Sequence, residues 1–167
     1  MIAEADTLTV TQADYADADD AAAIAQLLDL YARDPMGGAT PLSQDVLDKV
    51  VAGLAAAGNA FSLIARIDGE PVGLANCFFG FSTFAARPLV NIHDVAVDAR
   101  FRGRGIGRAL FAEIEAIAAA RGACKVTLEV LSGNAPARAL YASLGYGDYA
   151  LDPTTGAALF WQKRLDA

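Results

Sequence analysis

The stretch that decides the fold runs from residue 91 to residue 110: Asn-Ile-His-Asp-Val-Ala-Val-Asp-Ala-Arg-Phe-Arg-Gly-Arg-Gly-Ile-Gly-Arg-Ala-Leu. A run rich in β-branched residues leads into three glycines at alternate positions, and an apolar helical pattern follows. Glycine lets backbone N–H groups approach a ligand closely, and a helix N-terminus adds the positive end of its dipole. Four arginines add charge here, and no acidic residue lies between Arg100 and Arg108. The stretch therefore predicts a pyrophosphate cradle and a nucleotide-like cofactor.

Length and composition are those of a globular α/β protein. The chain has 167 residues, of which 54% are hydrophobic and 20% charged, so we expect residues 1–167 to form a single domain. Its apolar runs are far shorter than a membrane span, and its N-terminus lacks the regions of a signal peptide. These features predict a cytoplasmic location and no membrane partner. Cys77 and Cys124 lack metal-ligand spacing, and His93 is the one histidine, so no metal site is expected.

Charge is unevenly spread along the chain. The net charge of −7 argues against nucleic acid as a partner. Acidic side chains crowd the first 34 residues against a single basic one, Arg33, whereas the arginines cluster around the glycines. This acidic face either serves solubility or attracts a cationic substrate, and the sequence leaves both interpretations open.

Hydrophobic periodicity predicts an alternation of helices and strands. Helices are expected to begin at Asp19, at Ser43, after the glycines and at Asn134, which is placed to cap its helix. Strands are expected over residues 7–12, 60–67, 72–83, 89–97, 125–131 and 157–164, with a hairpin turn at Asp68-Gly69.

Several apolar residues are expected to face the core. In the second helix these are Val46, Leu47, Val50 and Leu54, and in the helix after the glycines Ile106, Leu110, Ile114 and Ile117. Regular strand alternation places His93 on one face with Val95 and Val97, and Asp94 on the other.

One interpretation of the glycines is a dinucleotide-binding fingerprint, with Glu129 as the ribose-binding acid. A strand precedes the glycines and a helix follows them, as that fingerprint requires. However, Asp98 to Arg102 separate the strand from the first glycine, and the spacing is Gly-x-Gly-x-Gly. The residues after Glu129 are also too few to complete a doubly wound sheet.

A second interpretation is a family resemblance. The segment from Val95 to Arg108 resembles the acyl-CoA pyrophosphate loop of the GCN5-related N-acetyltransferases (GNAT), Arg/Gln-x-x-Gly-x-Gly/Ala, which corresponds here to Arg102, Gly105 and Gly107. A second signature of that family, an asparagine followed seven residues later by a tyrosine, is matched by Asn134 and Tyr141. The two motifs together, in this order, cover about residues 90 to 147.

The resemblance implies a fold and a set of cofactor-binding residues. The fold is a mixed sheet of six to seven strands flanked by about four helices and splayed between strands 4 and 5, where acetyl-CoA binds as cosubstrate. The backbone of Val95, Ala96 and Val97 is expected to pair with the pantetheine arm. The expected pyrophosphate-binding residues are Arg102, Gly103, Arg104, Gly105, Ile106, Gly107 and Arg108. Asn134 either binds the pantetheine arm or only caps its helix.

The resemblance also implies N-acetylation of a primary amine on a small molecule or peptide, by direct attack in a ternary complex. Tyr141 resembles the general acid that protonates the leaving sulfur, and His93 and Glu129 are both candidates for the base. Asp94 is expected either to orient the surroundings of His93 or to bind a cationic substrate. A homodimer is compatible with the resemblance, and a non-catalytic acyl-CoA-binding protein on the same fold is the alternative function.

Overall fold

The computed structural model describes residues 7–149, 152, 154 and 156–165. The chain separates into two compact units, Met1–Leu128 and Glu129–Ala167. The first unit contains β1 (Leu8–Gln12), α1 (Ala18–Arg33), the 3-10 turn η1 (Pro35–Gly37), α2 (Gln44–Ala57), β2 (Ala60–Ile67), β3 (Glu70–Ser82), β4 (Arg87–Val97), the 3-10 turn η2 (Ala99–Phe101), α3 (Ile106–Ala120) and β5 (Val126–Leu128). The second unit contains α4 (Ala135–Ser143).

The first unit is built on a mixed sheet of strand order β1-β2-β3-β4-β5. The pairs β1–β2, β2–β3 and β3–β4 are antiparallel, and the pair β4–β5 is parallel. The β4–β5 ladder ends at the pair Ile92 and Leu128, although β4 continues to Val97. The outer edge of β4 beyond Ile92 therefore has no strand partner among the described residues, as a sheet splayed at this point requires.

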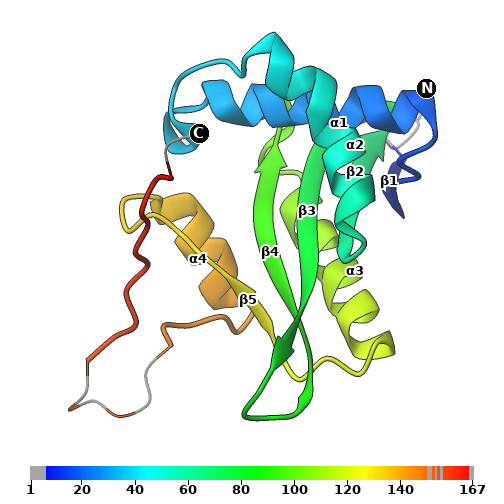
Figure 1. The fold of residues 1–167 in the computed structure, drawn as a ribbon. Coiled ribbons are helices and arrows are strands. Elements are labelled where there is room, and N and C mark those ends of the chain that lie inside the picture. The colour runs from blue at the N-terminus through cyan, green and yellow to red at the C-terminus, as the bar shows by residue number, and fades with distance from the viewer. Residues whose placement is uncertain (1–6, 150–151, 153, 155, 166–167) are drawn as a thin grey trace. The chain divides into compact units, whose positions relative to one another are not determined.

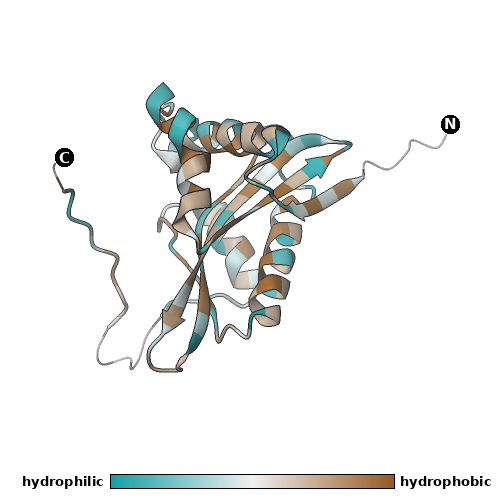
Figure 2. Ribbon diagram, turned by 45° about the vertical axis from the view of Figure 1, so that its right-hand side comes forward, coloured by the Kyte–Doolittle hydropathy of each residue, from teal (hydrophilic) through white to brown (hydrophobic). Residues whose placement is uncertain are grey.

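Helices cover both faces of this sheet (Figure 1). On one face, α1 and α2 bury a core of Ala23, Ile24, Leu27 and Leu54 against Ile64 and Leu74. On the other face, α3 packs so closely on β3 that a Cβ at Gly73 would lie 3.0 Å from Ile106 and 3.3 Å from Leu110. Hydrophobic residues recur along α3 between hydrophilic ones, which gives the helix one buried stripe (Figure 2).

Local sequence signals explain where the helices begin and end. Asp17 caps α1 by accepting from the N–H groups of Asp19 and Asp20, and Ser43 caps α2 by accepting from Val46. Gly58, at φ 71°, ends α2 in the left-handed conformation. Of the described residues, no helix is long and apolar enough to cross a membrane.

Most predicted elements are confirmed, but several predictions about single residues and strands are wrong. Val46 is 41% exposed because it lies in the first turn of α2, before that helix reaches the core. The predicted strand over residues 125–131 forms only from Val126 to Leu128, where its ladder with β4 stops. Residues 157–164 form no strand: the described sheet includes none of them, and the apolar residues Leu159, Phe160 and Trp161 are exposed. The described residues therefore form five strands rather than the six to seven predicted.

Candidate active site

A cavity of about 370 Å³ opens in the first unit between the α1–α2 layer and strands β3 and β4. Most of its lining is apolar, and its polar groups come from the two strands and from one tyrosine of α1. The described lining residues are Leu28, Tyr31, Ala32, Gly37, Leu42, Val50, Leu54, Asn76, Phe78, His93 and Asp94. A largely apolar pocket with a few polar groups is the usual form of a small-molecule site.

A β-bulge at His93 aims the polar groups of β4. Ile92 pairs with Cys77 and Asp94 pairs with Asn76, so the adjacent β3 residues face two β4 residues with His93 between them. The extra residue shifts the alternation of side chains by one position. Asp94 consequently shares a face with Asn76, and both His93 and Asp94 line the cavity.

The bulge overturns the predicted division of β4 into faces. Val97 pairs with Gly73, which lies beneath α3, so Val95 and Val97 face α3 rather than the cavity. His93 is therefore separated from these valines and joined to Asp94. The prediction failed because it assumed an uninterrupted period of two.

A hydrogen-bonded chain of side chains holds Asp94. The Asn76 Nδ2 group donates to Asp94 Oδ2 at 3.1 Å, and Ser62 Oγ donates to Asn76 Oδ1 at 2.7 Å. Because the Ser62 proton is used in that bond, the Tyr15 hydroxyl must donate to Ser62 Oγ, 3.0 Å away. These donors and acceptors give the series of hydrogen bonds one direction, from Tyr15 to the Asp94 carboxylate. Ser62 and Asn76, in the middle of the series, are 0% and 2% exposed.

Burial and the Asp94 charge both raise the pKa of two neighbouring side chains, Tyr31 and Cys77. Burial raises the pKa of the Tyr31 hydroxyl, and the charges of Asp94 and Asp34 raise it further. Burial and the Asp94 charge raise the pKa of the Cys77 thiol to about 12. Cys77 is therefore a protonated core thiol at neutral pH, as expected of an inert cysteine.

His93 is an exposed side chain that lines the cavity. Its imidazole meets the Phe78 ring edge to face, with 5.6 Å between centroids and 86° between planes. This edge-to-face contact orients the imidazole, and Asp94 lines the same cavity.

The open edge of β4 carries backbone groups that point away from β3. The N–H of Asp98 donates to the Val72 carbonyl on β3, so alternation turns the N–H and C=O groups of Val95 and Val97 outward. The Val97 carbonyl accepts a bond from Arg102 Nε at 3.2 Å. An extended ligand could pair with this edge as an added strand does.

The glycine loop leads from that edge to an uncapped helix. Gly103 and Gly105 have φ values of 79° and 82°, which L side chains rarely adopt. Gly105 is the N-cap residue of α3, and no side chain caps the first turn. The leading N–H groups of α3, those of Ile106 and Gly107, thus lack an intrahelical partner, as in an anion-binding helix terminus.

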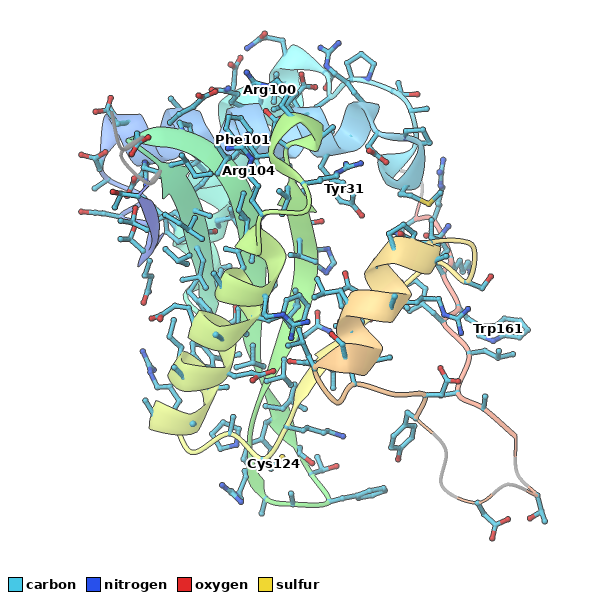
Figure 3. All side chains as sticks on the ribbon, turned by 180° about the vertical axis from the view of Figure 1, so that it is seen from behind. Tyr31, Arg100, Phe101, Arg104, Cys124 and Trp161 are labelled. Atoms are coloured by element: carbon cyan, nitrogen blue, oxygen red, sulfur yellow. The ribbon has the colours of Figure 1, made fainter. Side chains whose placement is uncertain are left out.

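The arginines of the loop differ in their surroundings. Arg100 bonds to Asp98 and to Glu70, and Arg102 bonds to Asp34 Oδ2 at 2.8 Å. Arg100 and Arg104 both lie over the Phe101 ring, at 5.1 and 5.2 Å from its centroid. Figure 3 shows Arg100, Phe101 and Arg104 at the same end of the first unit as Tyr31, with Cys124 at the opposite end.

Three predicted site residues lie in the second unit. Asn134 caps α4, its Oδ1 accepting from the Ala137 N–H at 3.2 Å, which confirms the capping role. Tyr141 is half-buried on α4, with its ring 6.5 Å from that of Tyr146. Glu129 follows the end of β5, so no sheet register fixes its side chain.

A family model described as the Acetyltransferase (GNAT) family matches residues 24–146. This match covers well over half of the chain, so the chain belongs to the GNAT acetyltransferase family, whose cosubstrate is acetyl-CoA.

Curated relatives agree over part of the chain. An uncharacterized N-acetyltransferase of Methanocaldococcus jannaschii is 37% identical over 84 residues, which are 50% of this chain and 37% of that protein. The thialysine N-epsilon-acetyltransferase of Bos taurus is 33% identical over 85 residues, 48% of this chain and 49% of its own length. The chain thus spans half or less of either relative.

Solved structures share the fold over nearly the whole chain. A probable acetyltransferase superposes with a TM-score of 0.79 at 15% identity, covering 95% of this chain and 99% of that one. The aminoglycoside N-acetyltransferase AAC(6')-Iy in complex with CoA gives 0.73 at 17% identity, covering 99% and 100%. Identities this low show the common fold alone.

Some residues of the cavity were not predicted as functional. Tyr31 and Asn76 line the cavity, and Ser62 donates to Asn76 from outside the lining, but none of the three was among the predicted site residues. The available signal was a serine and an asparagine within two apolar strands that pair with each other. Because buried polar groups need hydrogen-bond partners, such a pair indicates a polar network inside the sheet.

Proposed function

We propose that this protein transfers the acetyl group of acetyl-CoA to a primary amine by direct attack in a ternary complex. The observation that carries the proposal is the path from the open β4 edge, through two left-handed glycines, to the uncapped first turn of α3. This path would offer an edge for an extended arm and a cradle for phosphate, and the strand that begins it, β4, also lines the apolar cavity through His93 and Asp94.

The residues present fit acetyl-CoA, which supplies an activated acetyl thioester when bound. Outward backbone groups of Val95 and Val97 would pair with the pantetheine arm, with Ala96 between them. The amides from Gly103 to Arg108, with the Arg102 and Arg104 side chains, would hold the pyrophosphate. Asn134, already used as a helix cap, would contact the arm only through its remaining hydrogen-bonding groups.

The cavity supplies groups for the acceptor amine. Asp94 would bind the ammonium group, and His93 or Glu129 would take the proton that the amine loses as its C–N bond forms. The placement of His93 in the cavity beside Asp94 favours His93. Backbone N–H groups near the bulge would stabilise the developing oxyanion, and Tyr141 would protonate the sulfur as the C–S bond breaks.

The first experiment measures melting temperature with acetyl-CoA, CoA, NAD or buffer alone, followed by thiol release in the presence of primary amines. A ligand at about 100 times its Kd adds roughly 2.7 kcal/mol of stability, which raises the melting temperature by several degrees. We expect a rise with acetyl-CoA and CoA but not with NAD.

The two stages separate the candidate functions. Stabilisation without thiol release for any amine would favour a non-catalytic acyl-CoA-binding protein. No stabilisation by acetyl-CoA would contradict the proposed cofactor itself.

A further inference from the structure

The composition of the cavity points to one class of acceptor. We infer that the acceptor carries a single ammonium group on a compact apolar body, as in 2-phenylethylamine, and is not a polyamine or an aminosugar. This inference deepens the proposed function and rests on it, because it treats the cavity as the acceptor site.

The charge inside the cavity suits one cation. Asp94 is the one carboxylate among the described lining residues, and Asn76 holds it from a buried position. Asp34 is near enough for its charge to act on Tyr31, but it is already bonded to Arg102 and to the Met36 N–H. A second ammonium group on the acceptor would therefore find no uncommitted carboxylate within the described lining.

The rest of the lining suits an apolar body. Leu28, Val50, Leu54 and Phe78 surround the space, and burying apolar surface against them stabilises the bound acceptor. The cavity volume of about 370 Å³ is near the lower end of the range for small-molecule pockets, which is about 300–1,000 Å³. A hydroxyl-rich or multiply charged amine would lose more hydration there than the few polar side chains of the lining can replace.

The test is calorimetric titration of the full chain, with and without CoA, using 2-phenylethylamine, 2-phenylethanol, spermidine and sisomicin. We expect 2-phenylethylamine to bind about tenfold or more tightly than the alcohol, because a bond to a charged group is lost. Spermidine and sisomicin are expected to bind more weakly than 2-phenylethylamine. Tighter binding of either multiply charged amine would overturn the inference.

Matched variants locate the binding. Asp94→Asn should weaken 2-phenylethylamine binding about tenfold or more, whereas Asp45→Asn, on the exposed surface of α2, should not. Leu28→Trp should fill the cavity and weaken binding, whereas Leu30→Trp, on the exposed side of α1, should not. If the cavity variants and their controls weakened 2-phenylethylamine binding equally, the inferred acceptor class would also be overturned.

Failure of this inference is distinguishable from failure of the proposed function. Transfer of acetyl groups to spermidine or sisomicin in preference to 2-phenylethylamine would leave the transferase intact and refute the acceptor class. Binding of acetyl-CoA with no amine binding in the cavity would refute the acceptor class as well. Absence of acetyl-CoA binding would contradict the proposed acetyl transfer. The amine titration would still show which class of amine the cavity binds.

Discussion

At the scale of single residues, the same glycine-to-alanine change should have opposite effects at two positions. At Gly105, with φ 82°, alanine would be strained and should lower the free energy of unfolding by about 1–2 kcal/mol. At Gly53, inside α2 and with nothing within 4 Å of an added Cβ, alanine should raise it by about 0.5–1 kcal/mol. Urea denaturation measures both. A stabilising Gly105→Ala would show that the loop does not need its left-handed residue.

Tyr141 is the residue on which the proposed acid catalysis depends. Tyr141→Phe removes the hydroxyl and keeps the ring that lies beside Tyr146. If Tyr141 protonates the leaving sulfur, kcat should fall about a hundredfold or more while CoA affinity stays nearly constant. Stopped-flow thiol release and CoA titration give the two quantities.

Tyr146→Phe is the matched control, because it removes a hydroxyl from the ring beside Tyr141 and leaves the Tyr141 hydroxyl itself in place. Unchanged kcat in Tyr141→Phe would refute the assigned role.

At the scale of elements, the Tyr15–Ser62–Asn76–Asp94 chain connects β2, β3 and β4 with the segment before α1. Ser62→Ala leaves both the Asn76 Oδ1 atom and the Tyr15 hydroxyl without their partner. It should cost about 1–3 kcal/mol of stability, since one of the orphaned groups is fully buried.

Tyr15→Phe removes only the end of the chain, and it should cost less than Ser62→Ala. Chemical denaturation of the two variants compares them. A larger loss in Tyr15→Phe would show that the chain is not the connected unit described above.

The Arg102–Asp34 pair joins the glycine loop to the end of α1 and the start of η1. The Arg102 guanidinium holds the pKa of the Asp34 carboxyl below its usual range. Asp34→Asn keeps the oxygen that accepts from the Met36 N–H but removes a negative charge near the proposed phosphate cradle. CoA affinity should rise about two- to fivefold, as expected for releasing an exposed pair.

Isothermal titration measures that change, with Asp45→Asn as the control for net charge. Weaker CoA binding in Asp34→Asn would indicate that Asp34 positions Arg102 rather than competing for it.

The elements also show where sequence alone was sufficient. Strand β2 has the predicted bounds, residues 60–67, because the Asp68-Gly69 turn and the buried apolar run fix both of its ends. The helix after the glycines has its predicted stripe, since Ile106, Leu110 and Ile114 are buried. The bulge at His93 was not predictable, because no local residue type marks it and it depends on pairing with β3.

At the scale of the whole molecule, the net charge of −7 should act on a cationic acceptor before it reaches the cavity. Raising NaCl from low to physiological ionic strength should increase the acceptor KM about two- to threefold, because screening weakens long-range attraction. Initial rates at saturating acetyl-CoA measure this, with sucrose at equal osmolality as the control. A KM independent of salt would assign the acidic face to solubility.

The family and fold followed from two motifs that lie far apart in the sequence, the glycine loop and the Asn134–Tyr141 pair. The choice of base did not follow, because it depends on which side chains the strands bring together. His93 lines the cavity with Asp94, while Glu129 lies beyond the end of β5. The single-domain organisation remains a prediction.

The bulge at His93 has a consequence for how this protein can diversify. Two neighbouring residues of a regular strand act on opposite sides and can change independently. Here His93 and Asp94, consecutive in the chain, line the same cavity. Under the proposed function, a substitution at either residue would therefore change the cavity that the other also lines, so acceptor recognition and proton removal would be coupled at this dipeptide.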